Sequence, residues 1–440
     1  MTPVTWCGDA PSAADRPDTF GGDEIHVIYA SPADGTDRFA QVASAIATDI
    51  GSIDAWWRVE DPTRTPRWDF AAFPSCSGFG ALDISDVKLS HDTAYYNSAP
   101  AQRLPLIRDD LVAAGFTDPT KKYLVYYDQA QPATGTECGS AYVSAQSGGF
   151  AGVFIAPNLE STAPGKGCGS IEATGIRGGY SAVVAAHELV NALGALDDTS
   201  SPGPPHKCPT DPLHVCDNSL DVLAPTPSAT TIDTAILDYK HDDYYAHSGS
   251  WWDVQDSPWL RHLNEAEAVV SVAVGAGGQS VVDTPQPNVS CAGATSCRWT
   301  WAAGSALTLT ASPAMGYRFV GWTGCPSAQG ATCSLTVAGA VSIRAQFAPP
   351  LHVLAFHLAF SHGGSLLTAT LRLNEAGQAD LVGCTFGTQP VASSTLRKTT
   401  ATCAWTVPVR YRGHRIRGFV DLDYKGETVI TKTFRVLVKK

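Results

Sequence analysis

A short stretch in the first half of the chain combines side chains that can bind a metal and move a proton. It runs from residue 186 to 197 and reads AHELVNALGALD. His187 and Asn191 are four residues apart, so on a helix they share one face. Glu188 follows His187 directly and lies beside that face. Imidazole is a common metal ligand, and a carboxylate can accept a proton from water.

In zinc hydrolases, two histidines at this spacing bind the metal and the glutamate between them is the general base. Here Asn191 stands at the second ligand position, Gly194 stands where the chain must turn, and Asp197 stands where a third ligand belongs. The pattern predicts His187, Asn191 and Asp197 as zinc ligands and Glu188 as the catalytic residue. A neutral amide oxygen suits zinc less well than imidazole. The sequence therefore leaves open whether catalysis is retained.

Two alternatives remain at this motif. The first is a buried helix without chemistry, in which His187 is a hydrogen-bonded core residue. In that case the apolar residues Val183, Val184, Leu189, Val190 and Leu193 pack on a sheet. The second is that a histidine from the following loop, His206 or His214, supplies the ligand that Asn191 replaces. Each of these also fits an exposed loop residue near a disulfide.

The motif resembles the active-site helix of metzincin-type metallopeptidases, HExxHxxGxxH, and its snapalysin variant, which ends in Asp. The chain over residues 5–262 is also similar to secreted actinobacterial proteins with a zincin-like head. Supporting segments are 204–208, 214–217, 221–223, 241–245 and 250–254. Two features depart from the family pattern: Asn191 replaces a ligand, and the usual methionine of the turn is absent, with Leu223 nearby instead.

This resemblance implies an α+β head, with a mixed sheet and an active-site helix. It implies zinc as cofactor, Glu188 as catalytic residue and hydrolysis of a peptide or protein substrate. Asp197 and His206 would complete the zinc site with His187. A catalytically inactive pseudo-peptidase remains the other outcome. A different class of function is a non-catalytic surface binding or adhesion protein, in which β modules display the head.

Charge divides the 440-residue chain into regions. Residues 1–264 hold 34 Asp and Glu against 15 Lys and Arg, whereas residues 351–440 hold 5 against 12. An acidic head repels phosphates and argues against nucleic-acid binding. The basic end could meet an anionic cell-wall polymer through Arg410, Arg412, Arg415 and Arg417, which alternate along an expected strand. A solvated sheet face is the plainer interpretation.

The 12 cysteines predict a disulfide framework and an oxidising compartment. Close spacing predicts the pairs Cys208–Cys216, Cys291–Cys297, Cys325–Cys333 and Cys384–Cys403. The remaining four are expected to pair as Cys7–Cys76 and Cys138–Cys168. We expect a secreted or cell-surface protein, although residues 1–25 show no signal peptide. No apolar run approaches 18 residues, so no membrane-spanning helix is expected.

Periodicity predicts an α/β head followed by two all-β domains. In the head, strands are expected at 24–30, 122–127 and 150–155 and helices at 37–57 and 181–193, with a Pro-rich loop over 199–227. Residues 265–350 form short strands and resemble the divergent internalin-type B repeat, on segments 304–311, 319–325 and 345–347 with their cysteines. Residues 351–440 alternate with period two and predict an Ig-like sandwich of about seven strands. The expected domains are 1–264, 265–350 and 351–440.

Overall fold

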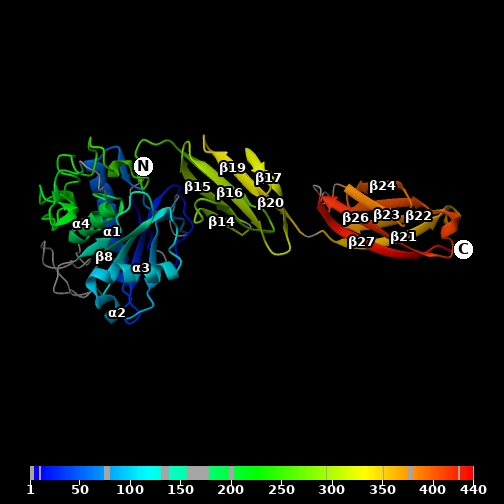
Figure 1. Ribbon diagram of the computed structural model, residues 1–440, viewed down its shortest axis with the longest axis horizontal. Coiled ribbons are helices and arrows are strands. Elements are labelled where there is room, and N and C mark those ends of the chain that lie inside the picture. Colours follow the sequence, from blue (N-terminus) through cyan, green and yellow to red (C-terminus); the bar gives the residue numbers. More distant parts are fainter. Residues whose placement is uncertain are drawn as a thin grey trace. The chain divides into compact units, whose positions relative to one another are not determined.

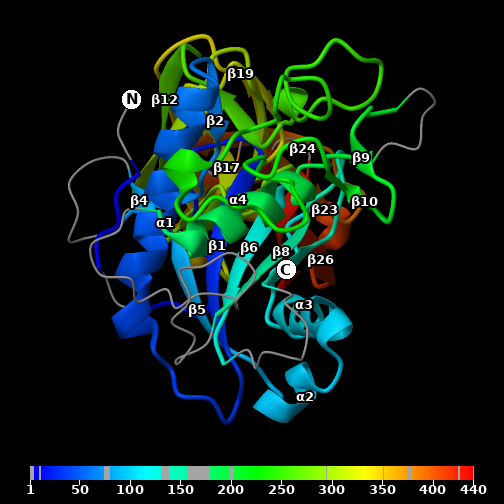
Figure 2. The same ribbon diagram turned by 90° about the vertical axis from the view of Figure 1, so that its left-hand side faces the viewer.

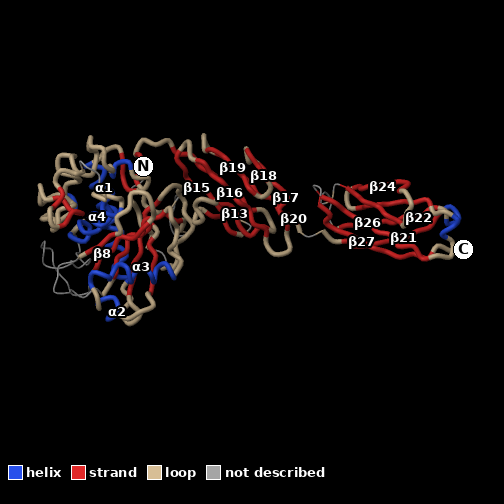
Figure 3. The backbone as a smooth tube through the Cα atoms, viewed as in Figure 1, coloured by secondary structure: helices blue, strands red, loops and turns tan. Residues whose placement is uncertain are grey.

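A computed structural model describes residues 4–8, 11–73, 80–129, 138–155, 178–197, 203–293, 295–349, 351–374, 379, 381–424 and 427–439. The chain divides into two compact units, residues 1–312 with 321–345 and residues 313–320 with 346–440. In the described chain the α-helices all lie between residues 39 and 192, and the part from residue 267 onward is mainly strands (Figure 3). The three-domain division itself stays a prediction.

The head is built on a five-stranded mixed sheet. Its order is β5 (Ile84–Lys88), β1 (Glu24–Ser31), β6 (Lys121–Tyr127), β8 (Gly149–Phe154) and β7 (Gly139–Ala141). The first four strands are parallel, and β7 pairs antiparallel with β8. The three predicted strands are confirmed as β1, β6 and β8. Their apolar runs are buried on both faces, as parallel strands covered by helices require.

Helices cover both faces of this sheet (Figures 1 and 2). On one side, α1 (Phe39–Glu60) and α4 (Tyr180–Ala192) share a core with Ile25 and Val27 of β1. On the other side, α2 (Thr93–Asn97) and α3 (Arg103–Ala113) share a second core with Ile28 and Ala30. Neighbouring residues of a strand point to opposite faces, which gives the head one core on each side of the sheet.

Helix α4 carries the HELVN motif and is buried along its whole length. The helix begins at Tyr180, one residue before the predicted start, and Gly179 is its N-cap. The helix ends before Gly194, which has a φ of 93°. A Cβ at this position would lie 2.7 Å from the backbone of Ala145, so the turn predicted here requires glycine.

The region after α4 is mostly turns, but it contains a hairpin where only a loop was predicted. The hairpin joins β9 (Lys207–Cys208) to β10 (Asp211–Val215), and the disulfide Cys208–Cys216 closes it. Smaller head elements are β2 (Arg64–Pro66) with β11 (Leu260–His262), β3 (Phe70–Ala71) with β4 (Ala81–Leu82), and the 3-10 helices η1 (Pro100–Gln102), η2 (Ile232–Thr234) and η3 (Val254–Asp256).

The repeat region forms two sheets. One has the order β15 (Ser296–Ala302), β12 (Glu267–Val274), β20 (Val341–Ala348) and β17 (Arg318–Thr323). The other has β14 (Ser290–Ala292), β13 (Gly278–Asp283), β16 (Ala306–Pro313), β19 (Thr332–Thr336) and β18 (Ser327–Gln329). Backbone hydrogen bonds join it to the head, since Thr300 donates to Thr19 at 2.9 Å and Gly21 donates to Thr300 at 3.0 Å.

The second unit contains the seven strands that were expected, arranged in two sheets among its described residues. They are β21 (Val353–Ser361), β22 (Leu366–Leu373), β25 (Thr400–Thr406) and β24 (Val391–Arg397) in one sheet, and β23 (Leu381–Phe386), β26 (Arg415–Tyr424) and β27 (Glu427–Leu437) in the other. Cys384 of β23 and Cys403 of β25 form a disulfide between the sheets. Phe386, Trp405 and Phe434 stack in the shared core.

The expected arginine row is wrong in part. Arg415 and Arg417 do lie two residues apart on β26. Arg410 instead lies in the 3-10 helix η5 (Val409–Tyr411), and Arg412 lies in the turn that follows it. A 3-10 turn does not keep the two-residue alternation of a strand, so the four side chains do not share one strand face. A further 3-10 helix, η4 (His362–Gly364), joins β21 to β22.

Candidate metal centre

A pocket of about 440 Å³ lies where α4 meets the edge strand β7 and the hairpin strand β10. Three residues of the predicted motif line it, namely His187, Glu188 and Asn191. They face the same pocket because positions 187 and 191 are one helical turn apart. His214 of β10 lines the opposite wall. The pocket therefore brings together two histidines, a carboxylate and a carboxamide.

The two histidines meet through their Nε2 atoms, which lie 3.1 Å apart. Nδ1 of His187 donates a hydrogen bond to the carbonyl oxygen of Val222 at 2.6 Å. Nδ1 of His214 lies 2.9 Å from Oδ2 of Asp211 but makes no hydrogen bond. The proton on Nδ1 of His187 leaves a lone pair on its Nε2 atom, which faces Nε2 of His214. That lone pair can accept a proton from His214 or bind a cation that lies between the two rings.

His187 is held in its neutral form. Its side chain is buried, which disfavours the charged imidazolium, and the neighbouring His214 adds to this effect. Together they lower the pKa of His187 to about 4. Neutral imidazole is the form that binds metals, and a carbonyl or carboxylate on the other ring nitrogen is the usual way to orient it.

The turn that orients His187 is organised by a buried aspartate. Asp221 Oδ1 accepts hydrogen bonds from the backbone of Leu223 and from the Tyr244 hydroxyl, both at 2.8 Å. Its Oδ2 accepts one from the backbone of Tyr239 at 2.7 Å. Burial raises the pKa of Asp221 to about 7. These bonds fix the turn in which the carbonyl of Val222 faces His187.

Asn191 and Glu188 contribute oxygen atoms. Asn191 is 5% exposed, and its Oδ1 atom is buried without a hydrogen-bond partner. Such an atom loses its solvation without replacement, so its position calls for a ligand in the pocket. Glu188 packs against Gly139 of β7, where a Cβ would lie 2.5 Å from Oε1 of Glu188. Glycine at position 139 thus makes room for the carboxylate.

The other two predicted ligands are not among the residues that line this pocket. Asp197 is exposed after the end of α4, where its charge acts on Lys122. His206 interacts with Asp243 instead. The Asp243 carboxylate accepts hydrogen bonds from the backbone of His206 at 2.8 Å and from its Nδ1 at 3.0 Å. With Asp217 and Asp242 close by, these carboxylates raise the pKa of His206.

Sequence reasoning named His214 only as one of two alternatives. Its approach to Asp211 gives no usable sequence signal, because residues three apart on a regular strand point to opposite faces and this strand is irregular between Asp211 and Val215. The contributions of the Val222 carbonyl and of Gly139 have no such signal, because neither is a side chain with polar atoms.

The four close cysteine pairs are confirmed as disulfides. They are Cys208–Cys216, Cys291–Cys297, Cys325–Cys333 and Cys384–Cys403. Cys76 and Cys168 lie outside the described residues, so Cys7–Cys76 and Cys138–Cys168 stay predictions. Disulfides at this density indicate folding in an oxidising compartment. None of the helices described is long and apolar enough to cross a membrane.

One part of the chain matches a known protein family. Residues 270–350 match the model of the divergent InlB B-repeat domain. This confirms the resemblance noted for the middle region, and its two sheets belong to that repeat. No curated protein matches the chain.

Among solved structures, a DUF3823 family protein from Bacteroides ovatus is 14% identical with a TM-score of 0.16. It covers 40% of this chain and 100% of its own. The catalytically inactive OgpA from Akkermansia muciniphila, solved with an O-glycopeptide, is 9% identical with a TM-score of 0.25. It covers 99% of this chain and 98% of its own. Likeness at these scores supports no conclusion about the fold or the function of this chain.

Proposed function

We propose that the head is a zinc-dependent hydrolase of the metallopeptidase type, with His187, His214 and Asn191 as zinc ligands. The observation that carries this proposal is the pair of Nε2 atoms at 3.1 Å, each on a ring whose Nδ1 atom faces an oxygen. Two nitrogen ligands of a tetrahedral Zn²⁺ are separated by about 3.3 Å. The unpartnered Oδ1 of Asn191 supplies a third donor at the same pocket. The donor set therefore fits zinc.

Glu188 is the catalytic residue in this proposal. Zinc, when bound, polarises the substrate carbonyl and lowers the pKa of bound water. The carboxylate of Glu188 accepts the proton of the attacking water and then donates it to the leaving amine. Its neighbour Gly139 leaves the carboxylate free to lie close to β7. The hydrogen bond from Nδ1 of His187 to the Val222 carbonyl keeps that imidazole in the orientation that this chemistry needs.

A peptide is the substrate class that the surroundings favour. Strand β7 is at the edge of the head sheet among the described residues, and Gly139, Ser140 and Ala141 line the pocket. An edge strand can pair with an extended peptide through backbone hydrogen bonds. Such pairing would lay a peptide bond along the pocket wall that contains Glu188. A strand that contains glycine and lies beside the site suits this pairing with a peptide.

The second candidate is a non-catalytic binding protein of the cell surface. Two observations favour it, the divergent InlB B-repeat at 270–350 and the all-β second unit. In this case the head recognises a peptide or a glycan without cleaving it, and the basic second unit contacts an anionic cell-wall polymer. Location at the cell surface belongs to this proposal.

One experiment separates the two candidates. The purified full-length protein, with its disulfides intact, is analysed for zinc and incubated with a mixture of unstructured polypeptides whose cleavage is followed by mass spectrometry. The hydrolase proposal expects one equivalent of zinc and cleavage that disappears in Glu188→Gln, while zinc remains. Zinc without cleavage in the wild type favours the binding protein. A wild type that takes up no zinc contradicts the metal centre.

A further inference from the structure

A second group of carboxylates lies inside the head, and its residues are distant in sequence from the motif at 186–197. Glu24, the first residue of β1, is fully buried, and neither of its carboxylate oxygens has a hydrogen-bond partner. Asp69 is also fully buried, and its Oδ1 has no partner. Asp18 is 4% exposed. One carboxylate oxygen from each of these three residues lies within 4.8 Å of the others.

The positive charges near this group do not balance it. Lys121 Nζ donates to Asp18 at 2.7 Å, to Asp69 at 2.6 Å and to Asp15 at 3.1 Å. His26 Nδ1 lies 2.6 Å from Oδ2 of Asp69. Even when His26 is protonated, these two cations face four carboxylates, those of Asp15, Asp18, Glu24 and Asp69. These two cations therefore leave two of the four negative charges unmatched.

Two arginines lie near this group. Arg16 forms an ion pair with Asp83. Arg67 lies 3.8 Å from Oε2 of Glu265 and 3.4 Å from the carbonyl oxygen of Gly21, and its charge also favours the ionised form of Glu24. With Arg67 included, the carboxylates still outnumber the cations by one. An isolated buried carboxylate is costly and either takes up a proton or binds a cation. Burial and the nearby carboxylates raise the pKa values of Glu24 and Asp18 well above their usual range. This shift has the same cause as the excess of negative charge.

We infer that Asp18, Glu24 and Asp69 bind one hard divalent cation of the Ca²⁺ or Mg²⁺ class. The free donor atoms are carboxylate oxygens, which these ions prefer. Oxygen ligands on opposite sides of Ca²⁺ are about 4.6–5.2 Å apart, so a spacing within 4.8 Å accommodates it. Zinc is disfavoured, because the two nitrogens of His26 are already engaged by Asp69 and by Ser85. A divalent ion would supply the positive charge that the neighbouring side chains lack.

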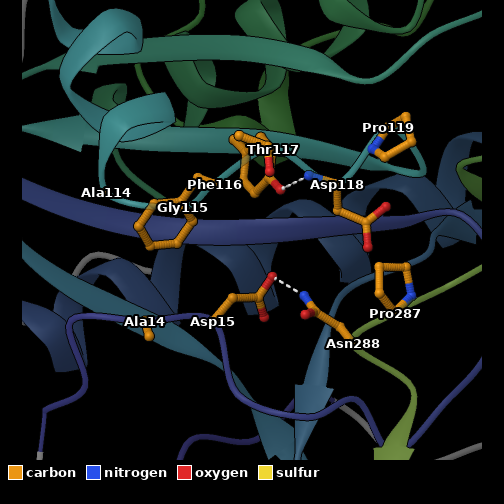
Figure 4. Close-up of a pocket in the computed structure, with 11 residues that line it drawn as sticks. Ala14, Asp15, Ala114, Gly115, Phe116, Thr117, Asp118, Pro119, Pro287 and Asn288 are labelled. Carbon is orange, nitrogen blue, oxygen red and sulfur yellow. Dashed lines mark hydrogen bonds between the residues drawn. The ribbon is translucent and has the colours of Figure 1, made fainter. Parts of the chain in front are cut away.

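The site would also tie the repeat to the head. Asp18 donates its backbone N–H to the carbonyl oxygen of Asn288 at 3.1 Å, and Asn288 Nδ2 donates to Oδ2 of Asp15 at 2.5 Å. Asp15, Tyr123 and Asn288 line a cavity of about 310 Å³ between the two regions (Figure 4). A cation that holds Asp18 against β1 therefore stabilises the segment on which the repeat docks. The cavity reaches Asp15, which Lys121 links to Asp18 and Asp69.

The test uses the full-length protein after removal of metals on a chelating resin. Ca²⁺ and Mg²⁺ are added in separate titrations, followed by calorimetry and by the thermal denaturation midpoint, and bound metal is measured by mass spectrometry. We expect uptake of one equivalent and a rise in the midpoint for the preferred ion. Glu24→Gln should lose both, whereas Asp49→Asn, which removes another buried carboxylate with an unpartnered oxygen, should keep both. His187→Ala should also keep both, because it alters only the proposed zinc site.

Two results would overturn the inference. One is a folded wild type that takes up neither ion. The other is a Glu24→Gln variant that binds the ion as tightly as the wild type, or that is more stable than the wild type in saturating Ca²⁺, as expected of a carboxyl that holds only a proton. If Glu24→Gln does not fold, Tb³⁺ luminescence of the wild type, excited through nearby tyrosine and displaced by Ca²⁺, reports the site directly. Absence of that signal has the same meaning as absence of uptake.

Discussion

Nε2 of His187 lies 3.1 Å from Nε2 of His214, although the two residues are 27 positions apart in the chain. One comes from the buried helix α4 and the other from the hairpin strand β10. The Val222 carbonyl orients His187 by accepting a hydrogen bond from its Nδ1, and the Asp211 carboxylate lies 2.9 Å from Nδ1 of His214. The second imidazole of the proposed centre is thus supplied by the hairpin and not by the position four residues along the helix.

The first prediction concerns which loop histidine binds zinc. His214→Ala should lower zinc affinity at least about tenfold, because it removes one of two strong nitrogen donors. His206→Ala is the matched control, since His206 is held by Asp243 and does not line the pocket. Competition with a zinc-responsive dye measures both affinities. Equal losses in the two variants, or a greater loss in His206→Ala, would contradict this ligand set.

The second prediction concerns Asn191. Asn191→His replaces a neutral oxygen donor with imidazole and should raise both zinc affinity and the rate of peptide hydrolysis. The double change Asn191→His with Glu188→Ala should bind zinc as tightly and remain inactive, because no carboxylate then accepts the proton of water. Dialysis against zinc followed by metal analysis and a peptide cleavage assay tests both variants. No gain in affinity for Asn191→His would mean that position 191 does not face the metal.

Much of the framework could be predicted from sequence because its signals are local. The buried strands β1, β6 and β8 are short apolar runs, and the confirmed disulfides join cysteines that are close in the chain. Hairpin β9–β10 was missed because its strands are short and rich in Pro and charged residues, which disfavour strands in isolation. Packing against the rest of the head and the Cys208–Cys216 bond decide its structure instead.

The ligand set was harder to predict, because its members come from distant segments. Asp197 stands at the spacing of a third ligand, but the turn at Gly194 leaves it exposed. Whether His206 or His214 reaches the helix depends on the tertiary position of the hairpin, which no local pattern encodes. The group of Asp18, Glu24 and Asp69 was not predicted from the sequence for the same reason. Glu24 opens an ordinary apolar strand, and Asp18 and Asp69 approach it only in the folded head.

The third prediction is a pH dependence that arises from Asp49 of α1. Burial raises its pKa to about 7 from an unfolded value of 3.8, so the native state keeps a proton that the unfolded state releases between these values. The free energy of unfolding therefore falls as pH rises from 4 to 8, by a few kcal/mol at about 1.4 kcal/mol per pKa unit.

Asp49→Asn should remove this contribution, so that its stability relative to the wild type increases with pH. Urea denaturation at pH 5 and pH 8 measures the difference. Asp233→Asn, at an exposed position of η2, is the control and should leave the slope unchanged. A wild type and an Asp49→Asn variant with parallel pH profiles would show that Asp49 is ionised in the native state.

The last prediction tests the placement of Glu188 without changing Glu188 itself. A Cβ at Gly139 would lie 2.5 Å from its Oε1, well inside van der Waals contact, so Gly139→Ala must displace the carboxylate. Hydrolysis should fall by about 10²-fold or more, because a shift of about 1 Å in a catalytic group costs this much. Zinc content should stay unchanged, since the ligands lie on α4 and β10. Gly149→Ala is the control in the neighbouring strand, where the nearest atoms lie 3.8 Å from the added Cβ. If Gly139→Ala keeps full activity, Glu188 does not act from the position it occupies beside β7.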